Sequence, residues 1–255
     1  MSGKEVLSIY FQSWIGSVAI VSTSIFAFYF LAIKLGNYNE KDKKPGQVKR
    51  ELGHFFLTFG IMNTGLPLLS YLTSLLGFSI SYNFSRASIF VSFLIMFFSV
   101  DFLYYWFHRA LHTKYLFRFH KIHHDSKVVG PTTSFAFNYT EVIGNLILPF
   151  IVLFLLKNLV VINYWGILIY DLVYFVGTVW LHSNLLLSAY FTGWLHFLNI
   201  IAPSTHSEHH TQYRGNYGLY LLFFDRAFNT ELKIRSGDEQ NINEPSTHFD
   251  SNSTK

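Results

Sequence analysis

Long stretches without a charged side chain constrain this chain of 255 residues more than any other feature. The apolar runs lie between charges and cover residues 6–33, 52–85, 87–107, 142–156 and 158–181, interrupted only by Asp101 and Asp171. A helix that crosses a membrane needs about 20 mainly apolar residues, so each of the first three runs is expected to span. The last two runs are shorter or interrupted, and they are expected to form a helical hairpin.

The composition supports a membrane protein. Only 13% of the residues are charged and 51% are hydrophobic, whereas soluble domains carry about 25% charged residues. This composition argues against a disordered chain and against an ordinary cytosolic domain. Because there is no cysteine, a disulfide framework, a cysteine-based zinc site, an iron–sulfur cluster and a thiol nucleophile are excluded. The net charge of +4 is modest, and no nucleic-acid partner is expected.

The positive charges predict the orientation of the spans. Between the first two runs lie Lys34, Lys41, Lys43, Lys44, Lys49 and Arg50. The positive-inside rule places this loop in the cytoplasm, so residues after Phe107 and His182 are also expected on the cytoplasmic side. A further uncharged stretch, 185–202, is expected to lie at the interface or to re-enter. If it crossed, it would separate the histidines after it from those before it.

The histidines are clustered in short motifs. Four residues separate His108 from His112, and the pattern His-x-x-His-His occurs twice, at 120–124 and at 206–210. Such spacings place imidazoles on one helical face, and neutral imidazole is a common ligand of zinc, iron, copper and nickel. A single His-x-x-His pair on a helix surface would more often face solvent than bind a metal. Two copies of His-x-x-His-His together with a His-x-x-x-His pair favour a metal site.

The candidate ligand set exceeds the needs of one ion. It consists of His108, His112, His120, His123, His124, His182, His206, His209 and His210. One ion takes about four to six donors, so two ions are predicted, and a redox-active pair would suit a two-electron oxidation by O₂.

Two carboxylates are expected to support this set of ligands. Asp101 and Asp171 share helix faces with the nearest ligands, and they are the predicted hydrogen-bond acceptors of metal-bound imidazoles. His196 is left open, with a core or interface position favoured, and His54 and His248 are given no role.

The motifs resemble those of the fatty acid hydroxylase / sterol desaturase superfamily, which are integral-membrane non-haem di-iron oxygenases. The resemblance runs from about Asp101 to Thr230. Its pieces are Asp101-Phe-Leu-Tyr-Tyr-Trp-Phe-His-Arg-Ala-Leu-His112, His120 to His124, His182-Ser-Asn184, His206-Ser-Glu-His-His210, Asn216-Tyr-Gly218 and Phe224-Asp-Arg-Ala-Phe-Asn-Thr230. Two departures stand out. Phe137-Asn-Tyr-Thr-Glu141 keeps only the Phe and Glu of a common Phe-His-Pro-x-Glu pattern, and Asn229 replaces a usual glycine.

The resemblance implies a fold and an activity. The expected fold is an all-α bundle of about four to five transmembrane helices, capped by a cytoplasmic histidine-rich di-metal site. The expected reaction is O₂-dependent hydroxylation or desaturation of a lipid of the sterol, fatty acid or sphingolipid type. It implies two iron ions, with zinc as a possible substitute, and a separate electron donor such as a b-type cytochrome and its reductase. In a eukaryote, the expected location is the endoplasmic reticulum membrane.

The chain is expected to have three parts: an N-terminal transmembrane region at 1–86, a catalytic domain at 87–230 and a polar, disordered tail at 231–255. Two alternatives remain. A zinc-binding membrane transporter or scaffold would place ionisable residues deep within several spans, whereas most histidines here follow span ends. An inactive family member that only binds lipid is the other alternative, and the full ligand set argues against it.

Overall fold

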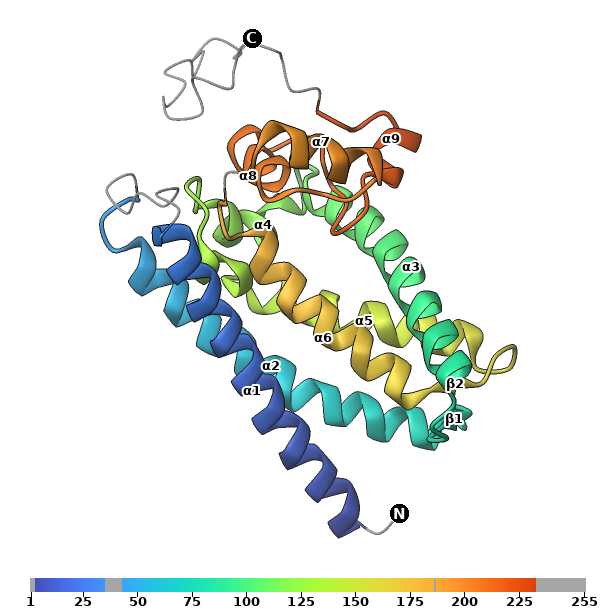
Figure 1. Cartoon of the computed structure of the whole chain (residues 1–255). Helices are drawn as coiled ribbons and strands as arrows, with labels where there is room; N and C mark the ends of the chain where they lie inside the picture. The colour runs from blue at the N-terminus through green and yellow to red at the C-terminus, as the bar shows by residue number, and fades with distance from the viewer. Residues whose placement is uncertain (1–2, 35–42, 186, 233–255) are drawn as a thin grey trace.

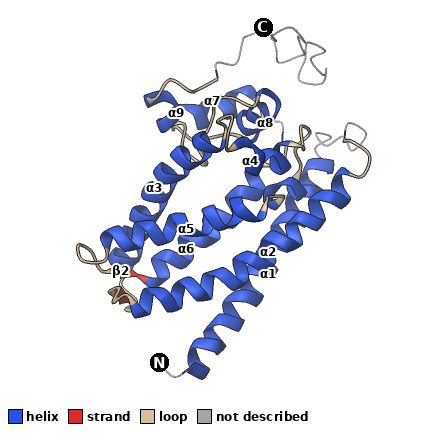
Figure 2. Ribbon diagram, turned by 180° about the vertical axis from the view of Figure 1, so that it is seen from behind, coloured by secondary structure: helices blue, strands red, loops and turns tan. Residues whose placement is uncertain are grey.

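The computed structural model describes residues 3–34, 43–185 and 187–232, and this part of the chain is almost entirely helical (Figures 1 and 2). The elements in chain order are α1 (Gly3–Lys34), α2 (Gln47–Leu75), β1 (Ile80–Ser81), α3 (Arg86–Leu111), α4 (Phe117–His124), the 3₁₀ helix η2 (Pro131–Phe135), α5 (Tyr139–Leu156), β2 (Ile162–Asn163), α6 (Tyr164–Leu181), α7 (Ala189–Phe197), α8 (Pro203–Gln212) and α9 (Phe223–Ala227). The predicted all-α fold is therefore confirmed.

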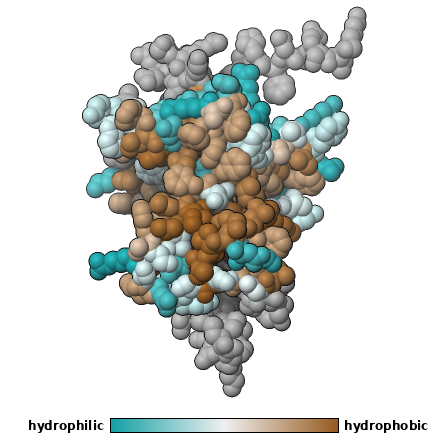
Figure 3. All heavy atoms as spheres, turned by 90° about the vertical axis from the view of Figure 1, so that its right-hand side faces the viewer, coloured by the Kyte–Doolittle hydropathy of each residue, from teal (hydrophilic) through white to brown (hydrophobic). Residues whose placement is uncertain are grey.

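Three of the described helices, α3, α5 and α6, are long and apolar enough to cross a membrane. They match the third, fourth and fifth apolar runs, so the predicted hairpin consists of α5 and α6. Helices α1 and α2 have 32 and 29 residues and match the first two runs, but neither is among the span candidates found in the described residues. That they also span, giving four to five transmembrane helices, stays a prediction. On the face where α3 lies, apolar side chains gather over the middle of the molecule (Figure 3). This band agrees with an integral membrane protein.

Local sequence explains where the three span helices begin and end. Each begins at a polar side chain that accepts a hydrogen bond from a backbone N–H of the first turn, namely Ser85, Asn138 and Asn163. Helices α3 and α6 end at C-cap histidines, His112 and His182. The C-terminal ends of α3 and α6 therefore place an imidazole each at the same end of the bundle.

The helices pack through two apolar clusters. Helix α3 lies against both α5 and α6, while α1 packs on α6 and α2 packs on α5. One cluster joins α3, α5 and α6 around Met96, and the other joins α2, α5 and α6 around Phe175. Gly166 allows α6 to approach α3 closely, because a Cβ there would lie 2.6 Å from the carbonyl oxygen of Ile89.

The two ends of the bundle differ. At one end, β1 and β2 form a short parallel pair that links the turn before α3 to the turn before α6. At the other end, α4, α7, α8 and α9 form a cap over the ends of α3 and α6 (Figure 1). All nine candidate ligands lie on the cap side, as the sequence predicted.

The stretch 185–202 does not cross the bundle. It contains α7, which has nine residues and is about 13.5 Å long, less than half of a hydrocarbon core of about 30 Å. Ile200 then pairs with Leu221 in the cap. The third histidine motif therefore stays on the same side as the other two, in agreement with the prediction.

Candidate metal centre

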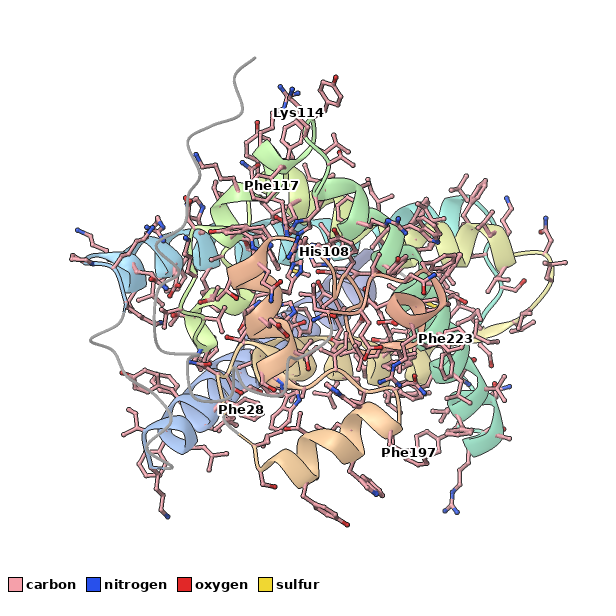
Figure 4. The ribbon with its side chains drawn as sticks, turned by 90° about the horizontal axis from the view of Figure 1, so that it is seen from above. Phe28, His108, Lys114, Phe117, Phe197 and Phe223 are labelled. Atoms are coloured by element: carbon pink, nitrogen blue, oxygen red, sulfur yellow. The ribbon has the colours of Figure 1, made fainter. Side chains whose placement is uncertain are left out.

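Four elements bring nine imidazoles together under the cap. The last turn and C-cap of α3 carry His108 and His112, α4 and α8 carry three histidines each, and His182 caps α6. Eight of the nine are buried, with at most 2% of each side chain exposed, and His112 is half-buried. In the view from above, His108 points into the middle of the cap (Figure 4).

The imidazoles form two groups. The five-histidine group contains His108, His112, His120, His124 and His209, and the four-histidine group contains His123, His182, His206 and His210. Within each group, one nitrogen per residue lies within 4.8 Å of all the others. The sequence predicted nine ligands and two ions, and the structure divides the same nine residues into two sets.

The division follows helical geometry. In α4, His120 and His124 are four residues apart and join one group, whereas His123 joins the other. In α8, His206 and His210 share a group, and His209 points to the other. Residues i and i+4 lie about 40° apart around a helix, but neighbours lie about 100° apart. Each His-x-x-His-His motif therefore serves both groups.

Hydrogen bonds to carbonyl groups fix the tautomers in the five-histidine group. The Nδ1 of His108 donates to the carbonyl oxygen of Tyr217 at 2.9 Å, and that of His209 donates to Gly215 at 2.7 Å. A carbonyl can only accept, so the proton of each neutral ring is on Nδ1 and its Nε2 carries a lone pair. These two Nε2 atoms lie 3.1 Å apart.

Two facing lone pairs cannot form a hydrogen bond, and they repel unless a cation lies between them. Nitrogen ligands at about 2.1 Å from one ion and at right angles to each other would be about 3.0 Å apart. The observed separation of 3.1 Å fits that geometry. The Nε2 atoms of His108 and His120 are 3.0 Å apart, and those of His182 and His206 are also 3.0 Å apart. The donor set therefore fits metal ions.

Burial keeps these imidazoles neutral. It lowers the pKa of His182 and of His112 to about 4. It lowers the pKa of His209 to about 3, with a further contribution from His112. The pKa values of His123 and His206 also fall well below the usual range, first through burial and then through neighbouring histidines. Neutral imidazole is the form that binds a metal.

A carboxylate that the sequence analysis did not select supports the five-histidine group. Glu141, in the first turn of α5, accepts a hydrogen bond from Nδ1 of His120 at 2.7 Å, and both side chains are buried. No helical spacing connects the two residues, because they lie on different helices. One feature of the sequence pointed to Glu141. In the segment 137–141, only Phe137 and Glu141 match the Phe-His-Pro-x-Glu pattern that is common in the family.

The structure gives Asp101 and Asp171 other surroundings than predicted. Asp101 accepts a hydrogen bond from the backbone N–H of Tyr220, and the Nδ1 atoms of His108 and His112 donate to carbonyl groups instead. A spacing of seven residues means two helical turns, or about 10.5 Å along the axis, which is too far for a carboxylate to reach an imidazole. For the same reason Asp171 does not reach His182, whose Nδ1 donates to the carbonyl of Thr178 at 2.8 Å.

A second carboxylate outside the predicted set is Asp225, in α9. Its two oxygens accept hydrogen bonds from the backbone N–H groups of Tyr217 and Gly218, each at 2.8 Å. The segment that it holds supplies the carbonyl groups that fix His108 and His209. Asp225 therefore positions the backbone behind the histidines.

Two of the remaining histidines, His54 and His196, are described, and neither belongs to the two groups. His196, in α7, is within 2.7 Å of the hydroxyl of Thr205, so the structure favours the interface position that was preferred for it. His54 is half-buried in α2. His248 lies outside the described residues, as does the predicted tail from residue 233 onward.

An apolar helical bundle that ends in two buried histidine groups defines a histidine-rich membrane protein with a candidate di-metal centre. A model of the family described as fatty acid hydroxylase matches residues 93–230, which is more than half of the chain. The chain therefore belongs to the fatty acid hydroxylase family, within the superfamily that its motifs resemble.

Named relatives support this assignment. The chain is 39% identical over 158 residues to very-long-chain aldehyde decarbonylase GL1-5 of Oryza sativa subsp. indica, covering 55% of this chain and 25% of that protein. It is 38% identical over 140 residues to very-long-chain aldehyde decarbonylase CER1 of Arabidopsis thaliana, covering 51% and 22%. The chain thus spans about a quarter of the length of these relatives. No solved structure matches the chain.

Proposed function

We propose that this protein is a metal-dependent oxidoreductase that uses O₂ to oxidise a long-chain lipid. The observation that carries the proposal is the pair of buried, neutral histidine groups at the end of an apolar helical bundle. Membership of the fatty acid hydroxylase family agrees with it.

The metal ligands proposed are the nine histidines, with one ion in each group, and iron is the metal proposed. Zinc prefers similar nitrogen ligands and could replace iron in purified material. When bound, a pair of iron ions supplies the redox chemistry by which O₂ and an external reductant oxidise a C–H bond. The chain's own task is to hold the ions and to orient their ligands, with Glu141 acting on His120.

The surroundings of the groups favour a dry site. The ligands are buried, and Phe137 packs against the ring of His123 with ring centroids 4.8 Å apart. Excluding water strengthens electrostatic interactions inside a site and prevents side reactions. A lipid could reach this end of the bundle from the bilayer.

We also propose that the histidine groups lie on the cytoplasmic side of the membrane. In a eukaryotic host this membrane is proposed to be that of the endoplasmic reticulum, and the electrons are proposed to come from a separate donor such as a b-type cytochrome.

Two classes of reaction are candidates. Family membership favours hydroxylation or desaturation of a fatty acid, sterol or sphingolipid. The names of the relatives add a second candidate, a reaction in which a very-long-chain aldehyde loses its carbonyl carbon. In both cases an apolar substrate lies in the membrane with one of its carbons at the metal centre.

The test uses the full chain in lipid nanodiscs, loaded with iron and supplied with a chemical or protein reductant. Long-chain fatty acids, sterols, sphingoid bases and aldehydes are offered, and products are identified by mass spectrometry. Product formation should require iron and O₂, and it should be lost in His123→Ala and in His209→Ala. Full activity in metal-stripped or anaerobic samples would rule the proposal out.

A further inference from the structure

Helix α7 presents its apolar side outward, which is opposite to a surface helix of a soluble protein. The exposed side chains are Tyr190, Phe191, Trp194, Phe197 and Leu198. Tyr190 is 84% exposed and Phe197 is 78% exposed, so their rings contribute almost nothing to the interior. Three of these residues, 190, 194 and 197, repeat at the spacing of one helical face. An exposed apolar patch of this kind marks a site that contacts another molecule or a membrane.

Polar contacts fix this orientation of the helix. His196 faces inward, with its Nε2 2.7 Å from the hydroxyl of Thr205 in α8. Arg226 of α9 donates to the carbonyl oxygen of His196 and to the side-chain oxygen of Asn199, each at 2.8 Å. Turning the aromatic side inward would break these bonds, so the outward position of the aromatic residues is built into the cap.

Helix α9, whose Arg226 donates a hydrogen bond to the end of α7, packs its aromatic side chains on the membrane-spanning helix α3. Trp106 of α3 packs against Phe228 with ring centroids 4.8 Å apart, and Phe102 packs against Phe224 at 5.3 Å. Phe223, the first residue of α9, is 56% exposed. In the view from above, α7 runs along one edge of the molecule, and Phe197 lies at that edge (Figure 4).

We propose that α7 docks the cap on the lipid bilayer, with its aromatic face in the boundary between headgroups and acyl chains. Residues 187–202 contain no Lys, Arg, Asp or Glu, and tryptophan and tyrosine favour this boundary. A helix of this kind lies in the plane of the membrane with its apolar face buried by about 5–10 Å. The aromatic contacts between the cap and α3, a helix apolar enough to cross a membrane, favour the bilayer over a second protein.

The inward side of α7 is linked to the segment that carries part of the four-histidine group. Thr205, which holds α7 through His196, is the residue before His206. One hydrogen bond and one peptide bond therefore separate His196 on the inner side of α7 from the ligand His206. This inference is independent of the reaction that the protein catalyses.

The absence of native cysteine allows a direct test with single labelled positions. Phe197→Cys carries an environment-sensitive fluorophore, and the full chain is placed in phosphatidylcholine nanodiscs with or without acyl-brominated lipid. The matched controls are Phe98→Cys, on an exposed site in the middle of α3, and Thr211→Cys, on an exposed site of α8. All three side chains are at least partly exposed, so thermal unfolding should change little.

Brominated lipid should quench the label at position 197 to an extent similar to that at position 98. Aqueous iodide should quench it several-fold less than the label at position 211. Strong quenching by iodide at position 197 would show that α7 is in water and would overturn the proposal. Protection from both quenchers would show that protein covers the helix, which would overturn it as well. Tyr190→Cys repeats the measurement at the other end of α7.

Discussion

The two histidine groups differ in how many of their rings make a hydrogen bond through Nδ1. In the five-histidine group, four rings use Nδ1 to bond a fixed acceptor; these rings are His108, His112, His120 and His209. In the four-histidine group, only His182 does so, and the Nδ1 atoms of His123, His206 and His210 make no hydrogen bond within the described chain. Such supporting bonds orient metal ligands and raise their basicity. One centre is therefore preorganised, and the other has more freedom to adjust.

The largest expected effect of this difference is on metal affinity. Loss of one supporting contact typically lowers metal affinity about 10-fold to 100-fold, and the groups differ by three contacts. We expect the five-histidine group to bind at least ~100-fold more tightly. Stepwise dialysis of the iron-loaded protein against a chelator, followed by metal analysis, should pass through a stable state with one ion per chain. Loss of both ions in a single step would contradict the comparison.

The next effect comes from removing one support from the tighter group. Glu141→Leu takes away the acceptor of His120 while keeping a similar volume, and it should weaken the tighter site by about 10-fold or more. The weaker site should be unchanged in the same titration.

Asp101→Asn is the matched control for this variant. It alters a buried carboxylate on α3 that contacts the backbone of Tyr220 and no histidine. Metal affinity should therefore stay at the level of the unmodified protein. A loss equal to that of Glu141→Leu would restore the role that the sequence had given to Asp101.

A third effect concerns pH, and one residue from each group illustrates it. His209 and His182 have pKa values of about 3 and about 4 when folded, against about 6.5 when unfolded. Between these values the unfolded chain binds more protons, so the stability of the metal-free protein should fall as pH decreases from 6.5 toward 4. Each such histidine contributes up to about 1.4 kcal/mol per pH unit. Thermal unfolding in detergent at several pH values measures this, and a flat profile would contradict it.

The smallest effect is expected from a histidine outside both groups. His196→Ala removes the contact with Thr205, and it should lower stability by about 1 kcal/mol with both metal sites intact. Thermal unfolding and metal analysis of the same sample give both values. A missing ion in this variant would mean that His196 takes part in binding.

Sequence alone predicted which histidines meet but not how they are divided. The spans and the end of the bundle that carries the site follow from charge-free runs, and the ligands follow from repeated spacing. That His123 and His124 point in different directions follows from the angle of about 100° between neighbours on a helix. Which histidines of α3, α6 and α8 each of them joins depends on how these helices pack, which no local pattern contains. Glu141 was missed because its partner is on another helix. Asp101 was given a role from its helix face without regard to the axial distance.

The division of neighbouring residues between the groups has a consequence for the distance between them. In α4 and again in α8, two consecutive residues serve different groups, and consecutive Cα atoms are about 3.8 Å apart. The separation of the two centres is thus set by the covalent backbone of two short helices rather than by a loop. Loops elsewhere in the cap can change length without altering it. By contrast, inserting a single residue between His209 and His210 would turn His210 by about 100° relative to His206 and His209 and remove it from the four-histidine group.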